Sequence, residues 1–358
     1  SRIGGMKRIS LVIVAFLLLT NFTWAVAGSD KYSNQKPLKM ALSWGTNVPK
    51  LGEYPKRFSD EVATRTNQTL IFQLHEPGAL TPANEVLQSV SSGQADAGWT
   101  TAGYWVGKDQ GFAVFASLPF GGDAKAHWQW MTTGRGTELL QSRLVRLGFN
   151  VTALPCYYMG AEGFGWFKKP INRPEDLRGL RMRFFGLGAR VMQKLGTSTQ
   201  LLAGGDIFPA LEKGVIDATE FSTPYMDIHY GFYQVASHYY YPGWHQPNGM
   251  TVLIINGDVW RSMDLYERNA IEGACESNVL HSLENENISI KQALKQLKAR
   301  GAIVLPVPPA ILSAARGAWD SVVAESARSS PFFKKAHTSL QSFVANQSQM
   351  TASTASSS

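Results

Sequence analysis

The hydrophobic pattern of the chain alternates between short apolar runs and segments with apolar residues at helical spacing. Residues 39–44 form one short apolar run, and residues 70–74 form another. The segment between them places Tyr54, Phe58 and Val62 four residues apart, the spacing of one helix face. Strands that alternate with helices in this way predict an α/β protein.

A second helix is expected to begin at Thr81, because a hydroxyl residue followed by proline is a common helix start. Gly93 suits the left-handed end of this helix, whose predicted core face consists of Val86, Leu87 and Val90. Strand and helix thus continue to alternate along the chain.

A short internal repeat indicates two similar halves. The segment Gly93-Gln-Ala-Asp96-Ala97 is matched by Gly214-Val-Ile-Asp217-Ala218, and Tyr104 and Tyr225 keep the same offset from these segments. In each copy a helix ends at glycine and a strand follows, so the next residues lie at the carboxyl end of a strand, where open α/β sheets bind ligands. The repeat therefore favours two lobes with a cleft between them.

A long helix is expected over residues 265–300. No glycine or proline interrupts the stretch from Cys275 to Arg300, and the preceding turns extend it to about 35 residues and roughly 50 Å. Such a helix would brace both lobes; the alternative is two helices broken around residues 284–287. The Ser/Thr-rich end of the chain predicts a disordered tail.

The N-terminal segment has the pattern of a secretory signal peptide. Lys7 and Arg8 precede an apolar run over residues 9–19, and Ala25-Val-Ala27 forms an A-x-A cleavage site. The alternative is an uncleaved anchor, but the run is shorter than the roughly twenty residues that span a membrane. Residues 1–5 precede a natural-looking start at Met6, and we expect the protein to be exported.

The composition excludes several classes of protein. The chain has 358 residues, of which 44% are hydrophobic and 17% charged, enough apolar mass for two cores and too few charges for extended disorder. The formal charge is +7, but Arg2, Lys7 and Arg8 lie in the segment expected to be removed, which leaves about +4. No basic cluster or nucleic-acid motif is present, so no nucleic-acid partner is expected.

The two cysteines allow neither a disulfide framework nor a multi-cysteine zinc site. Cys156 and Cys275 both lie in apolar contexts, which favours free buried cysteines. A single bridge between them is the alternative.

The common catalytic motifs are missing from the sequence. We find no G-x-S-x-G elbow, H-E-x-x-H motif, P-loop or dinucleotide fingerprint. The seven histidines are scattered, and only His238 and His245 lie near each other. This pattern disfavours an enzyme.

Four places in the sequence carry candidate binding chemistry. Arg183, in a predicted strand, has a guanidinium that suits a carboxylate, although such a residue is more often solvated. Glu220 follows Asp217 at a strand exit and suits a cation, a substrate hydrogen bond or a structural ion pair. Glu162 lies among glycines and aromatic residues that permit close approach to a ligand. The aromatic run 239–245 suits a pocket wall and equally a core.

Taken together, these residues resemble the solute-binding proteins of tripartite ATP-independent periplasmic (TRAP) transporters, in particular the branch that binds 2-oxo acids such as pyruvate. The resemblance covers about residues 39–340. Its closest stretches are Tyr104-Trp-Val-Gly-Lys-Asp109, Gly165-Trp-Phe-Lys-Lys169, Asp176-Leu-Arg-Gly-Leu-Arg-Met-Arg183, Ala203-Gly-Gly-Asp-Ile-Phe-Pro-Ala-Leu-Glu-Lys-Gly214 and Tyr239-Tyr-Tyr-Pro-Gly-Trp244. Several long motifs in one order are more specific than any single signature.

The resemblance implies a two-lobed α/β periplasmic-binding-protein fold, type II-like, with a long helix that spans both lobes. The expected divisions are upstream residues and signal peptide 1–27, lobe I 28–150 with part of 245–275 returning to it, lobe II 151–245, the spanning helix 265–300, a C-terminal helical region 301–345 and a disordered tail 346–358.

The resemblance also implies roles for individual residues. Arg183 matches the arginine that clamps the substrate carboxylate. Glu220 matches an acidic ligand of a bound cation, and Phe221 matches a position that gives its backbone carbonyl to the cation and is often tryptophan. The other expected substrate-binding residues are Thr101, Tyr104, Glu162, Trp244 and His245.

Glu162 departs from the pattern, because 2-oxo-acid binders typically have glutamine at this position. Glu162, Glu220 and a monocarboxylate would place three negative charges opposite Arg183, so Ca²⁺ is favoured over Na⁺ as the cation held by Glu162, Glu220 and Phe221. Alternatively, burial keeps Glu162 protonated, or Glu162 binds a polar group of another substrate without a metal. The Phe221 substitution also alters the pocket shape.

The leading hypothesis is a periplasmic solute-binding subunit that carries a small 2-oxo or 2-hydroxy monocarboxylate to a TRAP membrane permease. The alternatives are a secreted lyase or hydrolase that uses Glu162 and Glu220 as acid and base, and a sensor that uses the same fold without a transporter. Some relatives dimerise through C-terminal helices, and residues 330–337 could begin such an element in a homodimer. The chain becomes Ser/Thr-rich soon afterwards, so the sequence leaves the oligomeric state open.

Overall fold

The computed structural model describes residues 37–355. The predicted signal peptide and the residues before it lie outside the described residues. No helix among those described is both long enough and apolar enough to cross a membrane.

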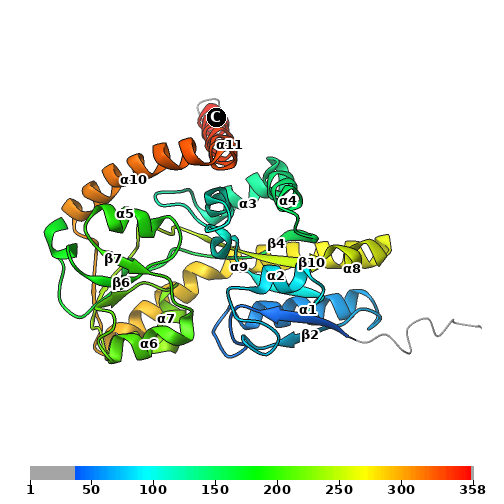
Figure 1. The fold of residues 1–358 in the computed structure, drawn as a ribbon, viewed down its shortest axis with the longest axis horizontal. Coiled ribbons are helices and arrows are strands. Elements are labelled where there is room, and N and C mark those ends of the chain that lie inside the picture. The colour runs from blue at the N-terminus through cyan, green and yellow to red at the C-terminus, as the bar shows by residue number, and fades with distance from the viewer. Residues whose placement is uncertain (1–36, 356–358) are drawn as a thin grey trace, which may run out of the picture. The chain divides into compact units, whose positions relative to one another are not determined.

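The first sheet, with its helices, forms lobe I (Figure 1). It is five-stranded, in the order β2-β1-β3-β10-β4. Its strands are β1 (Leu38–Leu42), β2 (Phe72–His75), β3 (Ala97–Thr100), β4 (Val151–Met159) and β10 (Gly249–Asn256). Its helices are α1 (Glu53–Arg65), α2 (Val86–Ser91), α3 (Ala124–Thr133), α4 (Gly136–Arg146) and α8 (Gly257–Ser262).

The second sheet, with its helices, forms lobe II. It is six-stranded, in the order β11-β9-β5-β8-β6-β7. Its strands are β5 (Gly165–Phe167), β6 (Arg181–Arg183), β7 (Ser198–Gln200), β8 (Ala218–Thr219), β9 (His238–Tyr240) and β11 (Ile303–Leu305). Its helices are α5 (Gly188–Lys194), α6 (Gly204–Glu212) and α7 (Pro224–Tyr230).

The internal repeat in the sequence corresponds to a structural repeat. In lobe I, β1 pairs in parallel with β2 and β3, and in lobe II, β6 pairs in parallel with β7 and β8. The carboxylate of Asp96 accepts a hydrogen bond from the backbone N–H of Lys39 at 2.7 Å, and that of Asp217 accepts one from Arg181 at 2.9 Å. The repeated Asp-Ala pairs therefore fasten the third strand of each unit to the first.

Helix α9 (Leu265–Ala299) is unbroken, so the predicted long helix is confirmed and the alternative of two helices is wrong. Asp264 and Glu267 form a capping box at its start, and the chain leaves the helix at Arg300. The helix packs on β4 of lobe I and on β11 of lobe II, and Figure 1 shows it running from one sheet to the other.

Helices α10 (Pro309–Ser329) and α11 (Pro331–Ala355) form a second connection between the lobes. Helix α10 packs on α5, and α11 packs on α3 and α4 (Figure 1). The C-terminal region is helical as predicted, but the helix continues to Ala355, where the sequence predicts disorder from residue 346.

Two boundaries differ from the sequence predictions. Helix α2 begins at Val86 rather than at Thr81, because Ser43 of the loop after β1 hydrogen-bonds the carbonyl of Ala83 and holds that segment as a turn. Strand β4 belongs to lobe I rather than lobe II, because it pairs with β10 along its whole length. The chain therefore crosses to lobe II after Met159, and the pairing partner that decides this is not visible in the sequence.

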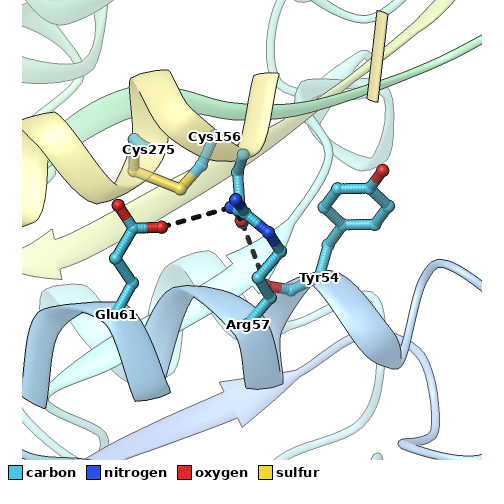
Figure 2. Close-up of a disulfide and its surroundings, with 6 residues drawn as sticks. Tyr54, Arg57, Glu61, Cys156 and Cys275 are labelled. Carbon is cyan, nitrogen blue, oxygen red and sulfur yellow. Dashed lines mark hydrogen bonds and ion pairs between the residues drawn. A yellow bond between two sulfur atoms is a disulfide. The ribbon is translucent and has the colours of Figure 1, made fainter. Parts of the chain in front are cut away.

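Cys156 and Cys275 form a disulfide, so the prediction of free cysteines is wrong (Figure 2). Cys156 lies on β4 and Cys275 on α9, with their Cα atoms 4.2 Å apart. An apolar sequence context is shared by buried thiols and buried disulfides, and only the packing of α9 on β4 brings the two together. Beside this bond, Arg57 of α1 donates hydrogen bonds to Ser277 and Asn278 of α9.

Candidate functional site

A pocket lies between the lobes at the carboxyl ends of β1, β3, β6 and β8, where the repeat predicts a ligand site. Its empty space, including the part open to solvent, is about 390 Å³. The rings of Tyr104 and Phe185 meet edge to face across the cleft with centroids 5.9 Å apart, so the lobes are closed. The lining residues are Trp44, Leu51, Thr101, Tyr104, Ala116, Met159, Glu162, Arg183, Phe185, Phe221, Ser222, Gln246, Gly249 and Met250.

Arg183, the last residue of β6, is 1% exposed and lines the pocket. Its Nε donates to the carbonyl of Leu202 at 3.0 Å, and its Nη1 donates to the carboxylate of Glu220 at 2.6 Å. Among the described residues, Nη2 makes no hydrogen bond. The guanidinium is thus fixed through two nitrogens, and the third is available to a ligand.

Glu220 follows β8 and is fully buried. Its Oε1 accepts hydrogen bonds from Arg183 and from the backbone N–H of Phe185, the latter at 2.7 Å. Burial alone would raise the pKa of this carboxyl, but the charges of Arg183 and His245 outweigh burial and lower it. Glu220 is therefore ionised.

Glu162 lies on the segment 160–164, by which the chain crosses from lobe I to lobe II. The segment 241–248, by which it crosses back, carries His245 and Gln246. The two segments pair, since the N–H of Glu162 donates to the carbonyl of Gln246 at 3.0 Å and the N–H of Gly243 donates to the carbonyl of Glu162 at 2.8 Å. The side-chain amide of Gln246 also donates to Oε2 of Glu162 at 2.7 Å.

His245 joins the two carboxylates. Its Nε2 lies 3.3 Å from Oε2 of Glu220 and 3.5 Å from Oε2 of Glu162. Burial lowers the pKa of His245, but the hydrogen bonds to Glu162 and Glu220 outweigh it and raise the pKa to about 9. Burial raises the pKa of Glu162 to about 7, against the opposing effect of His245.

The structure brings most of the predicted site residues together. Thr101, Tyr104, Glu162, Arg183 and Phe221 all line the pocket. His245 is not among the lining residues, and its Nε2 contacts both carboxylates.

Trp244 is not among the residues that line the pocket. Its ring stacks on Phe120 and Phe184, with centroid separations of 5.6 Å and 6.0 Å, and it is 4% exposed. Trp244, which the sequence predicts to bind substrate, is thus packed in an aromatic core next to His245.

Sequence reasoning missed several residues of the pocket. Trp44, Leu51, Met159 and Met250 provide apolar walls, and Ser222 and Gln246 provide polar groups. Trp44 follows β1 and Ser222 follows β8. Ligands of open α/β sheets bind at the carboxyl ends of strands, so this general rule could have found both residues. Gln246 carries no such signal.

The acidic cluster fits a hard cation. One ligating atom each from Glu162, Glu220 and His245 lies within 4.8 Å of the other two, and all three residues are buried. Among the described residues, Oε1 of Glu162 accepts no hydrogen bond. Carboxylate oxygens are the ligands that Ca²⁺ prefers, so the residues that would hold such an ion are Glu162 and Glu220.

Residues 40–330 match the bacterial extracellular solute-binding protein family 7. A monocarboxylate 2-oxoacid-binding periplasmic protein of Nostoc sp. is 33% identical over 307 residues, which are 85% of this chain and 83% of that protein.

Solved structures show the same fold. A TRAP transporter solute-binding protein from Bordetella bronchiseptica, with calcium and picolinate bound, matches with a TM-score of 0.84 and 29% identity over 88% of this chain and 94% of that chain. One from Pseudoalteromonas atlantica, with sodium and pyruvate bound, matches with a TM-score of 0.83 and 27% identity over 89% of this chain and 96% of that chain.

Proposed function

The chain belongs to the bacterial extracellular solute-binding protein family 7, the solute-binding proteins of TRAP transporters, and from this premise we propose that it binds a small 2-oxo or 2-hydroxy monocarboxylate. Pyruvate is the simplest such acid. The family consists of binding proteins of transport systems rather than enzymes, so the alternative of a lyase or hydrolase is set aside.

Arg183 carries the proposal. It is the one basic side chain among the described residues that line the pocket, and most of the remaining wall is apolar. One guanidinium pairs with one carboxylate, and a second carboxylate would be desolvated without a partner. The pocket therefore suits a monocarboxylate better than a dicarboxylate.

A bound cation is the second part of the proposal. We expect Glu162, Glu220 and the backbone carbonyl of Phe221 to hold it, and the cation to contribute positive charge beside the ligand carboxylate. His245 also contacts the two carboxylates, and when protonated it adds one positive charge to that of Arg183. Glu162, Glu220 and the ligand carboxylate carry three negative charges, and Arg183 carries one positive charge. Ca²⁺ with a neutral His245 would balance this difference, and so would Na⁺ with a protonated His245. We favour Ca²⁺ because two carboxylates face it.

Binding would be coupled to closure of the lobes. The pocket is lined from both lobes, so a ligand makes its full set of contacts only in the closed form and shifts the population towards it. We propose that the closed protein, exported to the periplasm, is the form recognised by TRAP membrane permease subunits. A homodimer is compatible with the Bordetella relative, which crystallised as a dimer.

A thermal-shift panel tests this function. Protein stripped of ligand is mixed with pyruvate, lactate, longer 2-oxo acids or succinate, each with Ca²⁺, Na⁺ or a chelator. A ligand that binds only the folded state raises the melting temperature. The proposal predicts a cation-dependent rise with a monocarboxylate and none with succinate. A rise with succinate alone, or with no acid, would contradict it. Incubation of pyruvate or lactate overnight, followed by mass spectrometry, should show no turnover.

A further inference from the structure

Glu286 is a buried acid outside the pocket with an unusual set of partners. It lies on α9 and is 7% exposed. Its Oε2 accepts a hydrogen bond from the backbone N–H of Gly160 at 3.1 Å and one from the hydroxyl of Tyr225 at 2.7 Å. Its Oε1 accepts one from the hydroxyl of Tyr157 at 3.1 Å. One carboxylate thus joins β4 of lobe I, the first crossover segment and α7 of lobe II.

The hydrogen bond from the backbone N–H of Gly160 to Glu286 fixes the start of the segment that carries Glu162. Two residues later the N–H of Glu162 is bonded to Gln246, and the N–H of Gly163 donates to the carbonyl of Ser222 at 3.2 Å. A Cβ atom on Gly160 would lie 2.8 Å from Cδ1 of Ile290, so the glycine lets this segment lie against α9. The hydrogen bond from Gly160 to Glu286 therefore fixes the position of the segment that carries Glu162 relative to α9.

The hydrogen bond from the hydroxyl of Tyr225 to Glu286 fixes the segment that follows Glu220. Tyr225 is the second residue of α7, and the carboxylate of Asp227 on the same helix accepts a hydrogen bond from the N–H of Ser222 at 3.0 Å. Ser222 and its neighbour Phe221 line the pocket directly after Glu220. Tyr225 matches Tyr104 in the internal repeat, and where Tyr104 faces the ligand pocket, Tyr225 instead reaches Glu286.

We propose that Glu286 is a positioning residue for the binding site, because its carboxylate holds both the Glu162 segment and helix α7 against α9. The inference rests on the proposed function, in which these segments bind the acid and its cation. Tyr157 serves as the internal control. It lies on β4, which the Cys156–Cys275 disulfide already ties to α9. Its hydroxyl also lies 3.2 Å from that of Tyr225, but Tyr225 donates to Glu286 directly, so this link between α7 and α9 is retained when the Tyr157 hydroxyl is removed.

The test compares Tyr225→Phe, Glu286→Gln and the control Tyr157→Phe. The Kd for pyruvate in Ca²⁺ is measured by calorimetric titration at a temperature well below the melting temperature of every variant. Tyr225→Phe removes the hydroxyl that reaches both oxygens of Glu286, and Glu286→Gln replaces the carboxylate that accepts from Gly160, Tyr157 and Tyr225. Each variant is expected to raise the Kd about tenfold. Tyr157→Phe should change Kd by less than about twofold although it also lowers the melting temperature. Equal changes in Kd for the two tyrosine variants would overturn the proposal.

Hydrogen exchange separates this inference from the proposed function. In ligand-free protein, Tyr225→Phe and Glu286→Gln should speed amide exchange at residues 161–164 and 221–223, whereas Tyr157→Phe should leave those amides unchanged. Unchanged exchange in all three variants would also reject Glu286 as a positioning residue. If wild-type protein binds no acid while the exchange pattern is as expected, the proposed function fails and the positioning role stands.

Discussion

Arg183 and Glu220 are bonded to each other at 2.6 Å, at the ends of the adjacent parallel strands β6 and β8, and both side chains are buried. The sequence assigns them separate roles, one as a clamp for a carboxylate and one as a cation ligand. The structure makes them a pair, so a change in one alters the electrostatics of the other. Removal of one partner from a buried ion pair costs roughly 3–5 kcal/mol.

The first prediction concerns the clamp. Arg183→Lys keeps the charge beside Glu220 but loses the planar fork that binds a carboxylate. We expect a folded protein whose affinity for pyruvate falls roughly ten- to a hundredfold, from the loss of hydrogen bonds between charged groups. Calorimetric titration measures the affinity, and circular dichroism checks the fold. Arg183→Ala should abolish binding and, because it leaves Glu220 buried without its partner, should also lower the melting temperature. Undiminished affinity in Arg183→Lys would reject the clamp.

The second prediction concerns the cation. Glu162→Gln removes one negative charge from the cluster and leaves a neutral oxygen ligand of the same length. We expect the preference for Ca²⁺ over Na⁺ to weaken or reverse, measured as the thermal shift with pyruvate in each salt. Glu138→Gln, a change in an exposed pair with Arg135, is the matched control and should leave the preference unaltered. The same cation dependence before and after Glu162→Gln would show that Glu162 does not hold the ion.

The third prediction is a pH dependence of the chelator-treated, ligand-free protein. The pKa of His245 is raised from 6.5 to about 9, so its contribution to stability is complete below 6.5 and is lost as pH rises through 9. The pKa of Glu162 is raised from 4.5 to about 7, so folding favours its protonated form, and this contribution is lost as pH rises through 7. The melting temperature should therefore fall from neutral to alkaline pH.

His245→Gln tests the source of this dependence. The variant should show a smaller fall in melting temperature between about pH 7 and pH 9 than the wild type does. His127 does not contribute in this window, because burial lowers its pKa to about 4 and it is neutral throughout. An equal fall in wild type and variant would place the titrating group elsewhere.

The fourth prediction concerns the disulfide. It links residues that are 119 positions apart, and closing a loop of this size stabilises a protein by roughly 2–5 kcal/mol. A Cys156→Ser, Cys275→Ser double variant should melt at a lower temperature but bind pyruvate with nearly the wild-type Kd, because neither cysteine lines the pocket. A large loss of affinity well below the melting temperature would mean that the disulfide also positions the site.

Local sequence signals predicted the long helix and the repeat well. The helix expected over 265–300 is found at Leu265–Ala299, because the absence of glycine and proline and the turns before Cys275 are both local features. The repeated Gly-x-x-Asp-Ala segments likewise mark equivalent places in both sheets, where glycine adopts φ of +81° and +71°. In these cases the residues that determine the structure are neighbours in the sequence.

Features that depend on distant contacts were not predictable in the same way. The lobe assignment of β4 depends on its pairing with β10, and the disulfide depends on the packing of α9 on β4. In the site, the resemblance singled out Arg183, Glu162 and Glu220, which the structure brings together. It did not show that His245 lies between the two acids, since residues 162 and 245 meet only through pairing of the two crossover segments.

The measurement that tests the central claim most directly is a calorimetric titration of pyruvate into ligand-stripped wild-type protein, with Ca²⁺ present and again with a chelator. The account predicts saturable binding with one acid per chain in Ca²⁺, much weaker binding in chelator, and no heat from succinate under either condition. Saturable binding of succinate, or no binding of any 2-oxo or 2-hydroxy monocarboxylate, would contradict it.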